Sequence, residues 1–301
     1  MLIVATAALA LAVVVRFNPS SLLLVAPGLK VRSSFCSVWK ASGDAHIKLR
    51  QLKVAKEIAQ ASHVVRRDGR LALWSTPAGE FWMPDGDDSI LPILLAQAER
   101  NIYGVGEWGV QKGDVVLDIG AYVGTWARQA LERGAGKVVA IEPSPDSIEC
   151  LKRNLAAEIA AGKVIVIEKG IWDSERTLTF FANSQSGVGN SFVETNETTK
   201  ALESIPVTTI DKLAADIGLG RIDFIKADVK GASERMLNGG AAVLRRDHPR
   251  IAISTEEPAD DAPAIARLAL AIEPAYEMKS GPCLLDSKDI YTDVLFFRAH
   301  R

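Results

Sequence analysis

Two acidic residues stand at the ends of neighbouring apolar runs, where a buried strand would give way to a turn. Asp118 lies at the end of the run Val115–Ile119 and begins a D-x-G-x-x-x-G pattern that finishes at Gly124. Glu142 follows the next apolar run, 22 residues after Gly120. Glycines allow a sharp turn and a close approach, so a ligand is expected to contact backbone N–H groups at the start of the following helix.

The spacing of this turn differs from the G-x-G-x-x-G pattern of dinucleotide-binding proteins. A carboxylate at Asp118 would repel a pyrophosphate, but it suits the cationic amino group of a methionine moiety. Glu142 suits acceptance of hydrogen bonds from two ribose hydroxyls, and its alternative interpretation is an exposed acid at a strand end. The pattern therefore favours S-adenosylmethionine as cofactor over a nicotinamide dinucleotide.

A third segment, Gly170 to Asp173, follows the next apolar run, at the height where such folds hold an adenine. Trp172 in this segment also fits a core position. The residues expected to contact the cofactor are, in chain order, Asp118, Gly120, Ala121, Tyr122, Gly124, Glu142, Pro143, Gly170, Ile171, Trp172 and Asp228.

Short apolar runs alternate with helical patterns from Lys112 onward, which predicts a parallel sheet with helices on both faces. The last two strands leave no room for a helix between them and are expected to pair antiparallel. The prediction is a doubly wound α/β fold with a mostly parallel seven-stranded sheet, which resembles class I methyltransferases and is Rossmann-like. The expected strands are 115–119, 137–142, 164–167, 177–181, 206–209, 222–227, 250–254, 276–279 and 294–297.

The N-terminal part predicts a helical extension. Leu49, Leu52, Ala55 and Ile58 recur at helical spacing within 47–63. Alternation and a turn indicate a short hairpin over 70–84, and a second helix is expected over 89–103. The chain is thus divided into an apolar segment (1–27), an extension (28–110) and a methyltransferase-like domain (111–301).

The first 15 residues form an uninterrupted apolar run that stops at Arg16. A helix needs about 20 residues to cross a bilayer, so this run favours a membrane anchor or a helix lying in the membrane plane. A helix packed on the domain and a cleaved signal peptide are the alternatives, and the second is disfavoured because no Lys or Arg precedes the run. Basic residues after it favour the cytoplasmic side, where S-adenosylmethionine is made.

Charge and cysteine content exclude some classes. The formal net charge is -2, which argues against a nucleic-acid partner, although Lys30 to Arg70 carry ten basic against three acidic residues, an excess of +7 that suits anionic lipid. Cys36, Cys150 and Cys283 are odd in number and far apart. They disfavour a disulfide scaffold, so a reducing compartment is expected.

With these motifs, and with Ile222 to Ala232 downstream, the chain resembles the FkbM family of methyltransferases over about Glu80 to Phe297. Tyr103 and Val207 to Asp211 belong to the resemblance. It implies transfer of a methyl group, usually to a hydroxyl oxygen of a natural product, sugar or lipid-linked acceptor.

The chain departs from the family at two places. The family's fourth strand usually closes with D-V-E-G-A-E, whereas here Asp228 is followed by Val-Lys-Gly-Ala-Ser, and Lys230 would oppose a hard divalent cation. No metal is therefore predicted. The family often shows S-T-Y-H after the fifth strand, and here the sequence is Ser-Thr with Glu256 and Glu257.

The catalytic candidates are Asp228 and Glu256. Asp228 lies at the end of the fourth strand and is expected to take the proton of a hydroxyl acceptor or to orient it. The alternatives are a helix N-cap for Asp228 and a solvated loop acid for Glu256. Lys230 is expected to pair with Asp228, to contact an acidic acceptor or to be solvated.

The acceptor is expected to be small or lipid-linked, with membrane association through residues 1–27 and no prediction of oligomeric state. The polar stretch from Asn183 to Lys200 is compatible with a lid. The alternative function is a cofactor-binding or membrane-tethered partner protein in which the altered acids have ended catalysis.

Overall fold

The computed structural model describes residues 30–87, 89–183, 192, 198–256, 259–286 and 289–299. Its central sheet has seven strands in the spatial order β13-β16-β12-β11-β5-β6-β7. Neighbouring strands are parallel except β16, which pairs antiparallel with both β12 and β13. This confirms the predicted fold class and the terminal antiparallel pair. The strands are β5 (Val115–Ile119), β6 (Lys137–Ile141), β7 (Val164–Ile167), β11 (Phe224–Ala227), β12 (Arg250–Ser254), β13 (Tyr276–Ser280) and β16 (Val294–Ala299).

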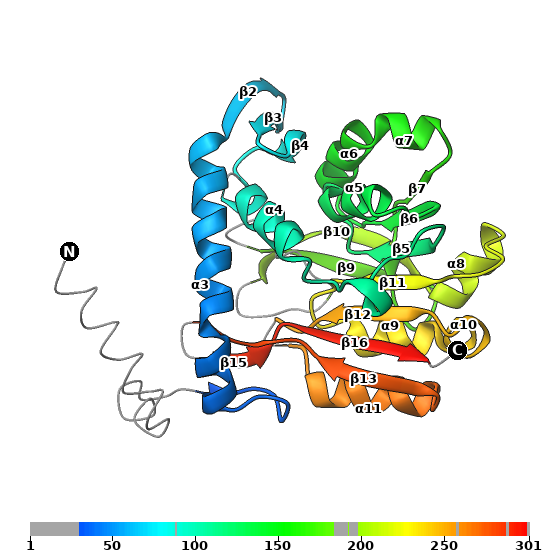
Figure 1. Cartoon of the computed structure of the whole chain (residues 1–301). Coiled ribbons are helices and arrows are strands. Elements are labelled where there is room, and N and C mark those ends of the chain that lie inside the picture. The colour runs from blue at the N-terminus through cyan, green and yellow to red at the C-terminus, as the bar shows by residue number, and fades with distance from the viewer. Residues whose placement is uncertain are drawn as a thin grey trace.

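Helices cover both faces of this sheet (Figure 1). Successive strand residues point to opposite faces, so Leu117 joins one core cluster and Val116 the other. The first cluster includes residues of α8 (Ile210–Asp216), α9 (Ser233–Gly239), α10 (Ala241–Asp247) and α11 (Ala262–Ile272). The second includes residues of α5 (Thr125–Glu132) and α6 (Pro145–Asn154), with α7 (Ala156–Ala160) at its margin.

The N-terminal extension packs beside the carboxyl ends of the parallel strands (Figure 1). It consists of the long helix α3 (Val38–Ala61), strands β2 (His63–Asp68), β3 (Leu71–Thr76) and β4 (Gly79–Pro84), and helix α4 (Ile90–Arg100). Helix α4 packs against both α3 and α5. The extension therefore lies at the sheet edge where α/β folds bind ligands.

The predicted helices of the extension exist with different limits. Helix α3 begins at Val38, nine residues before the predicted start, because Ser37 caps it by accepting a hydrogen bond from the N–H of Lys40. The hairpin is confirmed, and β2 adds a third antiparallel strand to it. In the domain, Leu155 ends α6 and precedes the first residue of α7.

Besides the sheet β2-β3-β4 of the extension, two further three-stranded sheets stand apart from the central one. The strands expected over 177–181 and 206–209 are β9 (Arg176–Asn183) and β10 (Thr198–Thr208), which pair with each other and with β8 (Gly170–Ile171) instead of joining the main sheet. Between β13 and β16 the chain forms an unpredicted hairpin of β14 (Cys283–Asp286) and β15 (Asp289–Thr292). Strand β1 (Lys30–Val31) pairs with β15, and η1 (Gly106–Trp108) is a short 3-10 helix.

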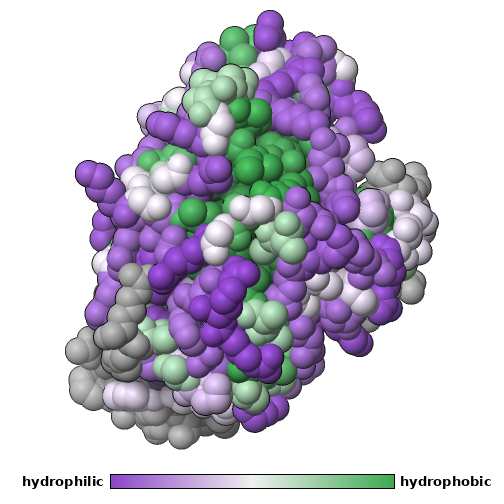
Figure 2. Space-filling view, turned by 90° about the vertical axis from the view of Figure 1, so that its right-hand side faces the viewer, coloured by the Kyte–Doolittle hydropathy of each residue, from purple (hydrophilic) through white to green (hydrophobic). Residues whose placement is uncertain are grey.

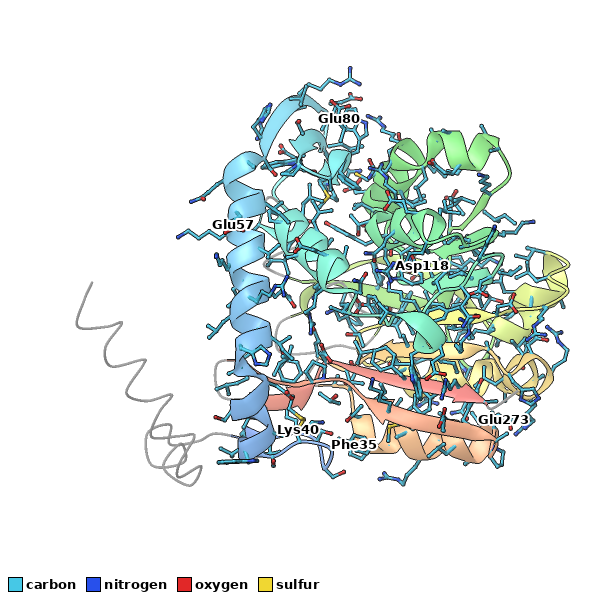
Figure 3. All side chains as sticks on the ribbon, in the orientation of Figure 1. Phe35, Lys40, Glu57, Glu80, Asp118 and Glu273 are labelled. Atoms are coloured by element: carbon cyan, nitrogen blue, oxygen red, sulfur yellow. A yellow bond between two sulfur atoms is a disulfide. The ribbon has the colours of Figure 1, made fainter. Side chains whose placement is uncertain are left out.

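A disulfide joins Cys36, just before α3, to Cys283 in β14. The cysteine count disfavoured a disulfide scaffold, but one disulfide is present, and Cys150 is a free, buried thiol. The two partners are 247 residues apart in sequence, so only the folded chain brings them together. Lys40 strengthens the same junction, since its Nζ donates to Oγ of Ser280 at 3.2 Å (Figure 3).

Within the described ranges, no helix is long and apolar enough to span a bilayer. The apolar segment 1–27 and most of the expected lid, 183–200, lie outside the described residues. On the side of the molecule at the right of Figure 1, hydrophobic residues gather in one area within a mostly hydrophilic surface (Figure 2). That side is remote from α3.

Candidate active site

A cavity of about 1100 Å³, its open mouth included, lies at the carboxyl ends of β5, β6 and β11. Leu94, Gln97 and Ala98, spaced along one face of α4, line it from the extension. Most of the predicted cofactor residues also line it. These are Gly120, Ala121, Tyr122, Glu142, Pro143, Gly170, Ile171 and Asp228.

Three predicted residues do not line the cavity: Asp118, Gly124 and Trp172. At Gly124 an added Cβ would lie 2.9 Å from Cδ1 of Leu155, so this glycine allows close packing of α6 and not the approach of a ligand. Trp172 is half-buried, with its ring edge toward Phe192 and the guanidinium of Arg235 over its face. Its interpretation as a packing residue fits better.

Asp118 is fully buried in β5, at the centre of the molecule (Figure 3). It is directly opposite Lys226 of β11 in the strand register, and Nζ of Lys226 lies 2.9 Å from its Oδ1. The same Nζ donates to the carbonyl of Gly120 at 2.6 Å. Burial raises the pKa of Asp118, and the charge of Lys226 opposes that rise. The aspartate thus fixes the lysine, and Lys226, not Asp118, reaches the cavity wall.

The N–H groups of the turn after β5 form hydrogen bonds within the protein. Those of Gly120 and Ala121 both donate to the carbonyl of Ile141, each at 3.0 Å. These two amides tie β5 to β6, and the N–H groups expected to face a ligand are those further along, at the start of α5 from Thr125 onward. Gly120 has φ +76°, and an added Cβ would lie 2.2 Å from the carbonyl oxygen of Asp228. A glycine is required here by the crossing of two backbones.

Glu142 is 7% exposed and lines the cavity. Its Oε2 accepts a hydrogen bond from the N–H of Tyr122 at 2.9 Å, and its Oε1 accepts one from the N–H of Ser144 at 3.0 Å. Burial raises the pKa of Glu142 to about 7, although the two amide hydrogen bonds oppose the rise. Each carboxylate oxygen has further lone pairs, so both oxygens remain able to accept from ligand hydroxyls.

Asp228 follows β11 and lines the same cavity. Its Oδ2 accepts a hydrogen bond from the hydroxyl of Tyr103 at 3.0 Å. Burial acts to raise the pKa of Asp228, but the charges of Lys230 and Lys226 and the Tyr103 hydrogen bond outweigh it, so the pKa lies below its ordinary value. The N-cap alternative is wrong, because α9 is capped at Ala232 without a side-chain hydrogen bond.

Glu256 lies just beyond β12 and is half-buried, and it is not among the cavity-lining residues. Burial raises the pKa of its carboxyl to about 7, helped by the negative charges of Asp293 and Asp228 and opposed by Lys230. Its backbone carbonyl accepts a hydrogen bond from Arg32 at 2.8 Å. Glu256 is therefore close enough to Asp228 for their charges to interact, and it is not a fully solvated loop acid.

Two residues of this site were not singled out from the sequence as functional. Lys226 stands in a strand whose four residues are all buried, and a buried lysine needs an anionic partner, so the signal was present. Tyr103 is 7% exposed, forms a T-shaped ring pair with Trp126 and has the ammonium of Lys226 over its face. A tyrosine at this position does not by itself indicate a functional role, because only the fold brings Tyr103 next to Asp228.

The fold and the cavity together define a class of protein. A parallel sheet with a reversed β16, an acid lining the cavity at the end of β6 and a glycine turn after β5 are the features of class I methyltransferases. The sequence model of the methyltransferase FkbM domain matches residues 118–274, just over half of the 301 residues. The chain belongs to the FkbM methyltransferase family.

The individual proteins that this chain resembles have low sequence identity to it, 27% or less. Methyltransferase sdnD of Sordaria araneosa is 27% identical over 189 residues, which cover 51% of this chain and 70% of sdnD. The crystal structure of methyltransferase FkbM from Methylobacillus flagellatus KT aligns with a TM-score of 0.48 and 17% identity over 84% of this chain, and this chain covers 60% of that one. Precorrin-6y C5,15-methyltransferase from Geobacter metallireducens GS-15 aligns with a TM-score of 0.41 and 14% identity, covering 73% of this chain and 94% of that chain.

Proposed function

We propose that this chain uses S-adenosylmethionine to methylate a hydroxyl oxygen of a small or lipid-associated acceptor. The observation that carries the proposal is the cavity in which Glu142 and Asp228 face the same space at the ends of β6 and β11. When bound, the cofactor supplies a methyl group on a sulfonium centre. The residues of the chain bind it, orient the acceptor and manage the acceptor's proton.

The cavity fits such a cofactor. Glu142 would hold the ribose hydroxyls, since its oxygens keep free acceptor capacity. Pro143, Ile171 and Phe180 supply apolar lining suited to an adenine. The amides of Gly120 and Ala121 already donate within the protein. Thr125 at the start of α5 also lines the cavity, so it would donate to the carboxylate of the cofactor's methionine moiety.

The proton of the acceptor has two candidate recipients. Asp228 lines the cavity, but its pKa is below the ordinary value, which makes it a weak base suited to orienting a hydroxyl. Glu256 has a pKa of about 7, which is matched to accepting a proton near neutral pH. We propose that Asp228 orients the acceptor and that the proton passes through Asp228 to Glu256, which does not line the cavity.

The acceptor side of the cavity is formed by α4. Leu94, Ala98 and Ile102 make this wall apolar, which favours a hydrophobic acceptor and not a nucleic acid. Attachment of the protein to the cytoplasmic face of a membrane through residues 1–27 is part of the proposal and rests on the composition of that segment.

A methyl-transfer assay tests the proposal. The full chain is incubated with methyl-labelled S-adenosylmethionine and a panel of hydroxylated small molecules and lipids. We expect transfer to at least one hydroxyl, reduced about 100-fold in Asp228→Asn and in Glu256→Gln. Cofactor binding without transfer to any member of a broad panel would contradict methylation, and full activity of Glu256→Gln would contradict its role in accepting the proton.

A further inference from the structure

The large apolar side chains with the highest exposure gather around helix α3. Among the described residues, eight large hydrophobic side chains are exposed, and five of these lie in α3 or in the strands β1 and β2 that precede and follow it. Ile93 lies in α4 and Leu285 in β14, and both of these elements pack against α3. Only Val105 among the eight lies elsewhere. The five are Val31, Trp39, Leu49, Leu52 and Val65.

Two of these side chains share one face of α3 with two lysines. Leu49, Leu52, Lys53 and Lys56 follow one another at spacings that place them on the same side of a helix. All four are exposed, and Leu49 and Leu52 are 67% and 50% exposed. We call these four residues the outer face of α3. It combines uncovered leucines with cations on an outer side of the molecule (Figure 1).

The charge of α3 is positive even when its own acids are counted. The helix contains five basic and two acidic residues, a net charge of +3. The acid Asp44 is directed toward the domain, because its Oδ2 accepts a hydrogen bond from the N–H of Cys283 at 2.8 Å. Glu57 lies 3.8 Å from Lys53, and both side chains are mostly exposed, so this ion pair is weak. Since Lys53 and Lys56 outnumber Glu57, the outer face keeps a net positive charge.

This combination of charge and apolar surface decides what can cover the outer face. A second copy of the same face would bring like charges together, which is unfavourable. The apolar segment 1–27 contains one arginine and no acid, so it does not neutralise the lysines. An anionic bilayer supplies both a negative surface for the lysines and hydrocarbon for the leucines. Trp39, 57% exposed near the start of α3, suits the interfacial region of a bilayer.

We propose that α3 lies along an anionic membrane surface, with Leu49 and Leu52 inserted among the lipids and Lys53 and Lys56 at the head groups. This contact adds to the attachment through residues 1–27 proposed above, and it does not depend on methyl transfer. The helix belongs to the extension beside the carboxyl ends of the parallel strands, which is also the side of the cofactor cavity (Figure 1). A lipid-associated acceptor would thus be held on the side of the molecule that methylates it.

A fluorescent label on the outer face tests the inference in the full chain. An environment-sensitive fluorophore is attached at Leu49→Cys. The native cysteines do not compete for it, because Cys150 is buried and Cys36 is joined to Cys283. We expect a blue shift with vesicles of phosphatidylcholine that contain about 30% phosphatidylserine, and none with pure phosphatidylcholine. The same label at Lys163→Cys, exposed just before β7, is the matched control and is expected not to shift.

A pair of charge variants tests the role of the lysines. Lys53→Gln combined with Lys56→Gln should weaken binding to the anionic vesicles about tenfold, and added salt should weaken binding of the parent chain as well. Lys112→Gln combined with Lys163→Gln removes the same charge near the amino ends of β5 and β7, and it should change the affinity less than about twofold. All four lysines are exposed, so both double variants are expected to keep the melting temperature.

The inference is overturned if the label at position 49 does not shift on anionic vesicles, if it shifts equally on neutral ones, or if the two lysine pairs weaken binding equally. Soluble polyglutamate that shifts the label as strongly as the vesicles would indicate an acidic protein partner and would overturn the lipid surface. Methyl transfer to a soluble acceptor, assayed without vesicles, should be unchanged in the variant with Lys53→Gln and Lys56→Gln. A failure of this inference is therefore distinguishable from a failure of the proposed methylation.

Discussion

Lys226 and Asp118 face each other on adjacent parallel strands, and Nζ of the lysine lies 2.9 Å from Oδ1 of the aspartate. Both side chains are almost fully buried, at 4% and 0% exposure. The pair places a cation beside the turn after β5 that lines the cavity, because the same ammonium also donates to the carbonyl of Gly120.

Breaking this pair from one side should be costly. Lys226→Met leaves the Asp118 carboxylate buried without its cation, so the free energy of unfolding should fall by about 3–5 kcal/mol in urea titrations. The double variant Asp118→Asn with Lys226→Met removes both charges and should recover at least half of that loss. A single variant that loses less than about 1 kcal/mol, or a double variant that loses more than either single one, would contradict the coupling.

Gly120→Ala should disrupt the turn for two reasons. The backbone of Gly120 has a positive φ, and the Cβ of an alanine would lie 2.2 Å from the carbonyl oxygen of Asp228. Gly113 is the matched control, since its φ is +88° but nothing lies within 4 Å of an added Cβ. Gly113→Ala should cost about 1–2 kcal/mol of unfolding free energy, and Gly120→Ala clearly more, with loss of cofactor binding. Equal stability of the two variants would show that the backbone crossing is unimportant.

Tyr103→Phe removes the hydroxyl that donates to Asp228. The hydrogen bond favours the ionised carboxylate, so its loss raises the pKa of Asp228 toward the ordinary value. Glu142 and Glu256, each with a pKa of about 7, set the acidic limb of kcat/KM against pH, so the change at Asp228 is read from the rate. Without the hydroxyl that orients Asp228, kcat should fall about tenfold with cofactor affinity unchanged. Tyr276→Phe is the control, because its hydroxyl donates to the carbonyl of Pro249 and Tyr276 does not line this cavity. An unchanged kcat in Tyr103→Phe would contradict the positioning role.

The disulfide predicts a thiol count. Unfolded protein kept without reductant should expose one reactive thiol, Cys150, and reduced protein should expose three. Cys36→Ser should lower the free energy of unfolding by about 2–5 kcal/mol, since the bond closes a long loop. Three thiols without reductant would mean that Cys36 and Cys283 are unpaired, as in the reducing compartment favoured by the cysteine count.

Local patterns in the sequence were sufficient for the central sheet. The apolar runs 115–119, 164–167 and 250–254 are strands with the predicted limits, because a strand buried on both faces needs a continuous apolar run. The hairpin β14–β15 was missed, since Leu284 and Leu285 were only a short apolar pair between two stronger strands. The start of α3 was missed because Ser37, its cap, is ten residues before residue 47, where the helical periodicity becomes clear.

The site was predictable to the extent that it depends on strand ends. Glu142 and Asp228 both line the cavity, as the ends of parallel strands require. Pairing across strands was not predictable, so Asp118 was assigned to the cofactor when its nearest cation is Lys226. The disulfide depends on contacts between residues 247 positions apart, which no local pattern reports.

Calorimetric titration of the full chain with S-adenosylmethionine at several pH values tests the central claim most directly. In the proposed complex, ionised Glu142 accepts hydrogen bonds from the ribose; the pKa of Glu142 is about 7, so affinity should fall as the pH decreases through that value. Glu142→Ala should weaken binding more than about tenfold and abolish this pH dependence, while Glu57→Ala on the exposed side of α3 should bind like the parent. Unchanged affinity in Glu142→Ala would contradict the assignment of this cavity to the cofactor.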